Sequence, residues 1–405
     1  MRRLLKKLRA WALPIAAGIL AVLCMVCLIW FGWLGRLLPS QKQAERWQGD
    51  GETKFAQISC FLPEDQKLSL QQVYAFRTEM LKALEAAAMD AKNASQLFSD
   101  AWSTSGKVDV STDQGHGKVS VMAVGGSFFQ FHPIRLLSGN YISPDDLMQD
   151  RVLLDEETAW LLFGGTELTG MSMKINGQPF VVAGVIEREQ DFASKKAYSS
   201  GMGIFMSFDA YYSLLNGGSN AASAPSGKQE GDQPQTPAPA PSVGISCYET
   251  VLAEPVKGFT MNLAKEKFPI GGGMIVDNSG RFEPGTILKL LSDFGERSMQ
   301  THGVILPYWE NAARCVEDWC LLALLLAIIA ALMPAALVLL ILIRYIRKGQ
   351  RKLADDILPQ AKEKAEEAIR VQQRKAWERR FAKTQAREDP PSLEEEKEPK
   401  DDKTP

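Results

Sequence analysis

Residues 11–33 read WALPIAAGILAVLCMVCLIWFGW and contain no charged side chain. A second uncharged run, residues 319–343, reads WCLLALLLAIIAALMPAALVLLILI. A helix of about twenty apolar residues, rising about 1.5 Å per residue, is long enough to cross the hydrocarbon layer of a bilayer. We therefore predict two transmembrane helices, and the rest of the chain is read relative to them.

Basic residues flank both apolar runs on their outer sides. The first run follows a basic start, Arg2, Arg3, Lys6, Lys7 and Arg9. A cleaved signal peptide has a similar start, but residues 11–33 exceed its usual apolar length and the following GWLGRLL lacks a small-residue cleavage site. The second run is followed by Arg344, Arg347, Lys348, Arg351 and Lys352. The positive-inside rule then predicts a cell-membrane protein that crosses twice, with both termini cytoplasmic and residues 39–317 extracytoplasmic.

The regions outside the two runs differ in composition. Residues 1–10 form a basic cytoplasmic start, and residues 344–405 form a charged cytoplasmic tail, predicted to be helical and then disordered. Within the outer segment, residues 216–242 are rich in Pro, Gly, Ser and Ala and nearly free of large apolar side chains. Such a stretch cannot bury enough apolar surface to fold, so we predict a disordered insertion.

The first half of the outer segment mixes strand and helix signals. Apolar residues alternate from Ala56 to Leu62, and Ser69 with Gln72 has the spacing of a capping box at a helix start. Residues 107–124 predict a hairpin around a glycine-rich turn. Asp155 is placed to cap a helix over 156–163, and Asn176-Gly177 is a strong hairpin signal.

The second half repeats this pattern. After the insertion, a strand is predicted over 243–252, a helix over about 258–267 and a strand over 274–276. A further helix is expected over about 284–294, and residues 304–317 are expected to run as a helix into the second apolar run. We predict an α+β class fold, in which a β-α-β outer domain carries an inserted α+β subdomain between two transmembrane helices.

Composition and motifs argue against catalysis and against nucleic acid as a partner. The 46 basic and 48 acidic residues give a net charge of -2, so the chain as a whole has no net positive potential to attract the phosphates of a nucleic acid. Three histidines and six cysteines offer little material for a zinc site. Both Gly-Lys pairs, Gly106-Lys107 and Gly117-Lys118, are followed by valine, so neither completes a nucleotide-binding P-loop. We predict a protein that is not an enzyme and needs no cofactor or metal.

Two cysteines of the outer segment deserve a test. Cys60 and Cys247 both fall in predicted strands, one in each half of the β-α-β framework. If those strands are neighbours, a disulfide is sterically allowed. A pair of buried free thiols is the alternative. Counting thiols on protein unfolded without reductant distinguishes the two.

Several stretches of the outer segment, in the same order, resemble the MacB-like periplasmic core domain of ABC-transporter permeases, and more loosely the FtsX-type permeases. They are residues 136–143 (LLSGNYIS), 151–164 (RVLLDEETAWLLFG), 170–185, 248–258 (YETVLAEPVKG) and 276–282 (VDNSGRF). The resemblance covers most of residues 50–310. It implies a porter-like β-α-β part interrupted by an insert, here about 125–242, and located outside the membrane between the first and second spans.

The resemblance also implies a function. We expect a non-enzymatic membrane subunit of an ABC-transporter-like complex, which couples a separate cytoplasmic ABC ATPase to the outer domain in efflux or mechanotransmission. Family permeases have two further spans, so we expect transport to need a four-span permease or a second copy as partner. The five basic residues after the second run are candidate contacts with the ATPase or with membrane lipid. The alternative is a membrane-anchored surface binding or regulatory module without an ATPase.

Overall fold

The computed structural model describes residues 2–87, 94–198, 203–216, 243–269, 273–293, 295, 297, 303–352 and 358–388. The chain divides into two compact units. One comprises residues 23–328, and the other comprises residues 1–22 together with 329–405. The predicted disordered insertion, residues 216–242, lies outside the described residues apart from Asn216.

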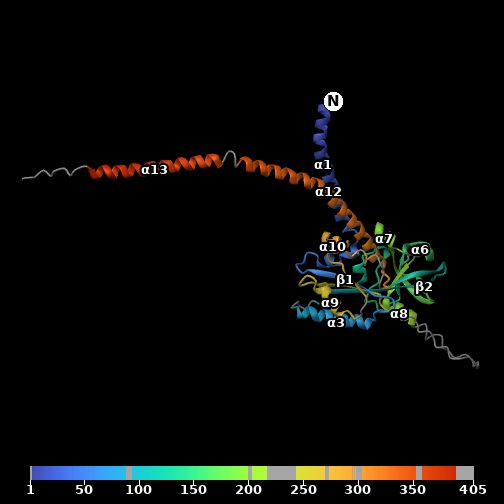
Figure 1. The fold of residues 1–405 in the computed structure, drawn as a ribbon. Helices are drawn as coiled ribbons and strands as arrows, with labels where there is room; N and C mark the ends of the chain where they lie inside the picture. Colours follow the sequence, from blue (N-terminus) through green and yellow to red (C-terminus); the bar gives the residue numbers. More distant parts are fainter. Residues whose placement is uncertain are drawn as a thin grey trace, which may run out of the picture. The chain divides into compact units, whose positions relative to one another are not determined.

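A mixed sheet of ten strands forms the centre of unit 23–328 (Figure 1). Its strands are β1 (Phe55–Phe61), β2 (Phe98–Ser111), β3 (His116–Gly126), β4 (Arg135–Gly139), β5 (Arg151–Asp155), β6 (Ser172–Ile175), β7 (Gln178–Glu187), β8 (Gly203–Ser207), β9 (Cys247–Ala253) and β10 (Met274–Asp277). The order across the sheet is β10-β1-β9-β2-β3-β8-β5-β7-β4, and β6 pairs with β2 and β7. The long strands β2 and β3 therefore connect β1, β9 and β10 on one side to β4, β5, β7 and β8 on the other.

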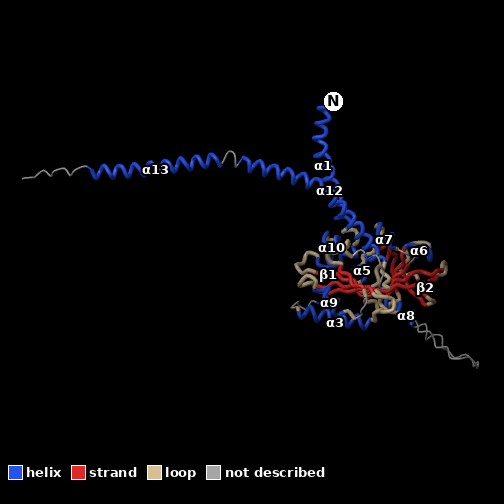
Figure 2. The backbone as a smooth tube through the Cα atoms, viewed as in Figure 1, coloured by secondary structure: helices blue, strands red, loops and turns tan. Residues whose placement is uncertain are grey.

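Helices cover both faces of this sheet. One face packs against α3 (Leu70–Ala86), α6 (Glu156–Phe163), α8 (Phe208–Asn216) and α9 (Phe259–Lys267), which share a single apolar core with the strands. The other face carries α2 (Gln43–Gln48), α5 (Phe128–Phe131) and the first turn of α12 (Tyr308–Lys352). Figure 2 shows α3, α8 and α9 on one side of the strands, with α7 (Phe192–Ala197) and α10 (Pro284–Lys289) on the other. The mixed α+β class is thus observed.

Local sequence signals formed where they were expected. Ser69 and Gln72 make a complete capping box at the start of α3. Asp155 accepts a hydrogen bond from the backbone N–H of Thr158 at the start of α6. Asn176 and Gly177 have positive φ angles of 46° and 83° between β6 and β7. Each of these signals acts within a few residues, so it does not depend on the tertiary context.

Two expected helices have different limits. The helix expected over 284–294 is α10, which ends at Lys289. The helical lead expected over 304–317 begins only at Tyr308. Pro307 explains the second difference, because a proline disfavours helical geometry in the residue before it and has no N–H to donate. Residues 304–307 instead run without regular structure into α12.

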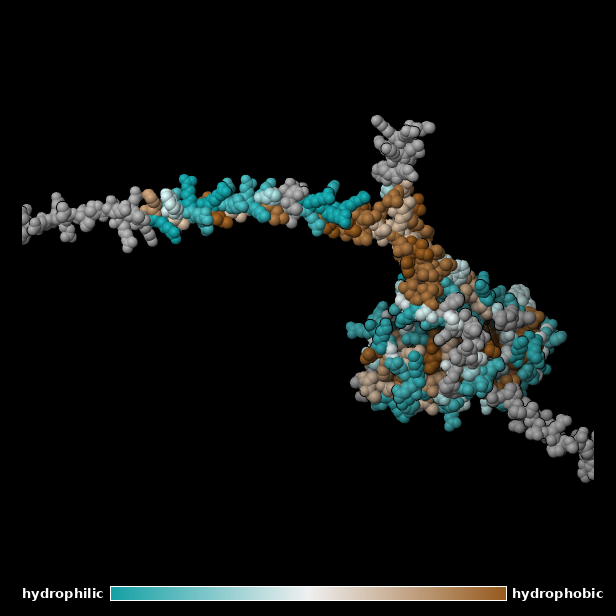
Figure 3. Space-filling model, in the orientation of Figure 1, coloured by the Kyte–Doolittle hydropathy of each residue, from teal (hydrophilic) through white to brown (hydrophobic). Residues whose placement is uncertain are grey.

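The two apolar runs lie in α1 (Arg2–Leu34) and α12. By length and composition, both helices are apolar enough to cross a membrane, and Figure 3 shows their apolar surfaces. Within unit 23–328, the end of α1 packs against α12, and the rings of Trp30 and Trp319 lie 5.8 Å apart. The short helix η1 (Pro39–Lys42) leads from α1 to α2. The remaining helices are α4 (Ala94–Leu97) and α13 (Leu358–Glu388).

Candidate functional site

A buried arginine marks the place where the sheet meets α12 and the segment that follows α1. Arg281 lies in the loop between β10 and α10, and its side chain is 4% exposed. Its guanidinium donates two hydrogen bonds to Glu310 of α12, at 2.7 and 2.9 Å. It also donates to Glu317 at 2.6 Å, to Asn278 at 3.2 Å and to Gln41 of η1 at 3.0 Å. One side chain thus joins the sheet edge to the segments next to both helices, and we call these contacts the Arg281 network.

The charges of the Arg281 network are balanced within the described residues. Glu310 also pairs with Arg314 at 3.0 Å, and Glu317 also pairs with Arg297 at 2.6 Å. Burial opposes the charge of Arg281, but the carboxylates of Glu310 and Glu317 outweigh it and raise the pKa of the guanidinium. Each carboxylate therefore has two arginine partners, which is the condition for placing ionised groups in an apolar interior.

The network continues into the sheet through polar side chains. Asn278 donates to the Ser59 hydroxyl at 2.8 Å, and Ser59 donates to Glu249 at 2.9 Å. Glu249 in turn lies 2.5 Å from the Nε2 atom of His132. The ring of His132 is 4.3 Å from that of Trp309 in the first turn of α12. The start of α12 is therefore linked to the sheet in two ways. One link is the pair of Arg281 with Glu310, and the other runs from Glu249 through His132 to Trp309.

The segment after α1 has its own contacts with the sheet. The buried side chain of Gln57 in β1 accepts a hydrogen bond from the backbone N–H of Gln43 at 2.8 Å. It also donates to the carbonyl of Ser40 at 2.8 Å. Together with the contact between Gln41 and Arg281, these bonds fix the chain immediately after α1 to the edge of the domain.

A second group of residues, which we call the Glu189 clamp, holds the first turn of α12 from the other half of the sheet. The Glu189 carboxylate, which follows β7, accepts hydrogen bonds from the hydroxyls of Tyr198 and Tyr308. The two tyrosine rings stack with centroids 4.4 Å apart. Arg188 lies 4.8 Å from the Tyr198 ring and pairs with Asp155. The segments that follow β7 and β10, on opposite sides of β2 and β3, thus contact the same turn of α12.

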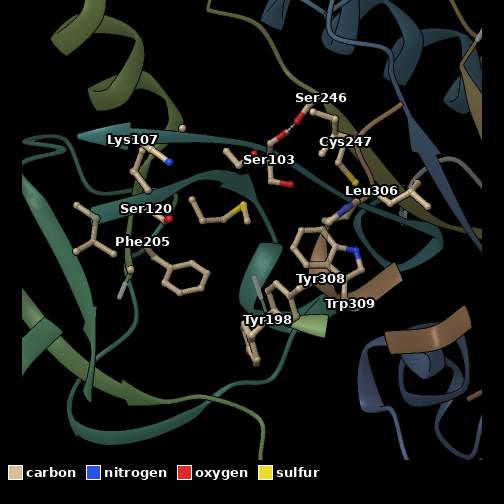
Figure 4. Close-up of a pocket in the computed structure, with 18 of the residues that line it drawn as sticks. Ser103, Lys107, Ser120, Tyr198, Phe205, Ser246, Cys247, Leu306, Tyr308 and Trp309 are labelled. Carbon is tan, nitrogen blue, oxygen red and sulfur yellow. Dashed lines mark hydrogen bonds between the residues drawn. The ribbon is translucent and has the colours of Figure 1, made fainter. Parts of the chain in front are cut away.

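A cavity of about 370 Å³ lies next to the Glu189 clamp, with Tyr198 and Tyr308 in its lining. Residues 305–309, which lead into α12, form one wall, and β2, β3 and β8 form the other. Figure 4 shows Ser103, Lys107 and Ser120 on the strand side, and Leu306, Tyr308 and Trp309 opposite them. The segment that enters α12 therefore has open space beneath it.

The two cysteines suggested by the sequence lie on adjacent strands, but their environments differ. In the pairing of β1 with β9, Cys60 is opposite Tyr248 and Cys247 is opposite Phe61. Cys60 belongs to the core on one face of the sheet, and Cys247 belongs to the core on the other. Both are free thiols, and for both, burial and then Glu249 raise the pKa of the thiol. In this register a one-residue offset turns the two side chains to opposite faces of the sheet, and whether they are bridged stays a prediction.

The basic residues proposed after the second apolar run lie in the last turns of α12. The side chains of Arg344, Arg347, Lys348 and Arg351 are exposed, and that of Lys352 is outside the described side chains. Their role as contacts stays a prediction. Among the described residues, no group of three or more His, Cys, Asp or Glu side chains is placed to hold a metal ion.

The Arg281 network was missed in the sequence, although two signals pointed to it. Arg281 lies inside residues 276–282, one of the stretches that carry the family resemblance. Glu310, Arg314 and Glu317 are spaced at i, i+4 and i+7 immediately before an apolar run, which places them on one face of a helix. Charged residues on one helix face, next to a run apolar enough to cross a membrane, need partners when they are buried, and that requirement could have identified the site.

Comparison with known proteins gives the following matches. The family model described as the MacB-like periplasmic core domain matches residues 12–233. The periplasmic region of MacB from Actinobacillus actinomycetemcomitans is 14% identical with a TM-score of 0.36, over 58% of this chain and 92% of that chain. The extracellular domain of the noncanonic ABC-type transporter YknZ from Gram-positive bacteria is 10% identical with a TM-score of 0.33, over 55% of this chain and 100% of that chain. A domain of a putative permease protein from Porphyromonas gingivalis is 10% identical with a TM-score of 0.28, over 55% of this chain and 86% of that chain. No curated protein matches.

Proposed function

The chain belongs to the family of the MacB-like periplasmic core domain, and from this premise we propose that it is a non-enzymatic membrane subunit of an ABC-transporter-like complex. In this role it transmits movement between its membrane helices and its outer domain. The two apolar helices and the family domain fit a location at the membrane. We further propose two spans, cytoplasmic termini and an extracytoplasmic domain over residues 39–317, with an insert at about 125–242.

The observation that carries this proposal is the buried Arg281 network. A structural anchor needs only a flexible tether to hold a domain at a membrane. Here instead Arg281 contacts the segment after α1 and the first turns of α12 at once, through Gln41, Glu310 and Glu317. Because paired buried charges tolerate little displacement, a shift of α12 or of the segment after α1 would be accompanied by a shift of the sheet edge.

The Glu189 clamp limits the direction in which α12 can move relative to the sheet. It holds Tyr308 from the β7 side of the sheet, whereas Arg281 holds Glu310 from the β10 side. The cavity beneath residues 305–309 has Tyr198 and Tyr308 of the clamp in its lining. A pull along α12 would therefore transmit force to the sheet through the segments after β7 and β10. Closing or opening the cavity is the displacement that the packing permits.

The work for such a movement would come from a separate cytoplasmic ABC ATPase, with either a four-span permease or a second copy completing a pathway. Purification of the tagged full-length protein in mild detergent, followed by mass spectrometry, tests this proposal. Recovery of a P-loop ATPase above an untagged control supports it. If no ATPase is recovered, but a surface enzyme or polysaccharide-binding partner is, the anchored surface module replaces it.

The five basic residues from Arg344 to Lys352 are the proposed cytoplasmic contact with the ATPase or with anionic lipid. A variant truncated after Lys352 keeps all five, whereas a variant in which all five are replaced by glutamine removes their charge. If the substituted variant recovers as much ATPase as the truncated one, the role in ATPase contact is excluded.

A further inference from the structure

The second half of α13 is strongly basic, although the helix as a whole is not. Residues 370–380 contain five basic side chains and one acidic side chain: Arg370, Arg374, Lys375, Arg379 and Arg380 against Glu378. Residues 361–369 contain two lysines and three glutamates. The net charge is therefore positive over residues 370–380 and slightly negative over residues 361–369, so the latter segment serves as an internal control.

One face of this basic half combines arginines with exposed aromatic rings. Arg370, Arg374, Trp377 and Phe381 are spaced at i, i+4, i+7 and i+11, which places them on the same face. Trp377 is 63% exposed and Phe381 is 51% exposed. Their rings stack with centroids 5.0 Å apart. Within the described residues α13 belongs to none of the apolar cores, so the two rings form an exposed apolar patch.

We propose that residues 370–381 lie along an anionic lipid surface, with Arg370 and Arg374 on lipid phosphates and Trp377 and Phe381 in the headgroup region. Tryptophan and other aromatic side chains favour the membrane interface, and clustered arginine and lysine are attracted to anionic lipid. Figure 3 shows α13 as mainly hydrophilic with isolated apolar positions, which suits a surface-bound helix better than a spanning one.

Continuity along the chain favours lipid over a protein partner. The α13 helix follows α12, which carries the second apolar run and ends in a further basic cluster. A segment tethered so close to a membrane helix meets a bilayer surface at high effective concentration. This inference does not depend on the proposed transporter role, since a surface module with the same tail would bind lipid equally.

Hydrogen exchange on the full-length protein in nanodiscs tests the proposal without any ATPase present. Nanodiscs of phosphatidylcholine alone are compared with nanodiscs that also contain phosphatidylglycerol. We expect exchange of residues 370–382 to slow several-fold in the anionic nanodiscs, and exchange of residues 361–369 to change little. Arg370→Gln with Arg374→Gln should reverse most of this slowing, since each charge near an anionic surface changes binding about fivefold.

Two further variants separate the proposed face from general helix properties. Trp377→Ser with Phe381→Ser removes the rings and should abolish the slowing. Ile369→Ser with Val371→Ser removes two exposed apolar residues outside the face and should leave it intact. Equal exchange in the two kinds of nanodisc overturns the proposal. So does equal sensitivity to both serine pairs, or slowing that requires an added cytoplasmic protein.

Discussion

Replacing Arg281 by methionine should destabilise the domain that contains the sheet more than the same replacement of an exposed arginine does. The substitution keeps much of the side-chain volume but leaves Glu310 and Glu317 each with one arginine partner, at 1% and 7% exposure. Removing one member of a buried ion pair costs about 3–5 kcal/mol, because the remaining charge stays desolvated. With about 2 °C per kcal/mol for a large domain, the unfolding midpoint should fall by roughly 6–10 °C.

The assay is thermal unfolding of the full-length protein in detergent, followed by tryptophan fluorescence. Arg135→Met is the matched control, because Arg135 pairs with Glu187 at 2.7 Å while 75% of its side chain is exposed. An exposed pair contributes about 0–1 kcal/mol, so this variant should unfold within about 2 °C of the parent. Arg281→Lys should fall between the two, since an ammonium cannot reproduce the two parallel bonds to Glu310.

Two results would refute this reasoning. One is a midpoint for Arg281→Met no lower than that for Arg135→Met. The other is additivity: Glu310→Gln combined with Arg281→Met should be less destabilising than the sum of the single variants, because the double variant removes both charges. Strict additivity would mean that the two side chains do not share an interaction.

Three other perturbations follow from the structure. Tyr308→Phe removes a hydroxyl donor from the Glu189 clamp and should cost about 1.5–3 kcal/mol in urea unfolding, as is usual for a bond to a charged group; a cost near zero would place this hydroxyl outside the clamp. Gly139→Ala should lower the free energy of unfolding by about 2–5 kcal/mol through strain and overpacking, because φ is +77° and a Cβ would lie 2.1 Å from a carbonyl oxygen. Gly164→Ala, which has open space around it, should lower it by only about 1–2 kcal/mol. Similar unfolding midpoints for the two variants would count against this packing. Cys60 and Cys247 should resist thiol reagents in the folded protein, because burial raises the pKa of both thiols, and unfolding without reductant should expose all six cysteines. A count two lower would instead support the bridge.

Much of the fold could be predicted because its signals are local. The Ser69 capping box, the Asp155 cap and the Asn176-Gly177 turn each depend on residues a few positions apart, and all three formed. The apolar runs in α1 and α12 are equally explicit. The start of α12 was misplaced because the effect of Pro307 was not weighed against the helical pattern after it.

The candidate site could not be predicted in the same way, because its parts are distant in sequence. Arg281 meets Gln41 and Glu310 only after the sheet has brought β1, β10 and α12 together. The relation of Cys60 to Cys247 depends on a single residue of register between β1 and β9. Alternation along each strand predicts that a side chain is buried, but not which face the neighbouring strand presents, so the sequence left both the bridge and the free thiols open.

Native-state hydrogen exchange on the Arg281→Met variant tests the central claim most directly, namely that one buried network joins α12 and the segment after α1 to the sheet. The account predicts faster exchange in residues 38–48 and in residues 308–320 together, with β5 and β7 unchanged and Arg135→Met without effect at either place. Faster exchange at only one of the two segments, or at neither, would contradict the claim.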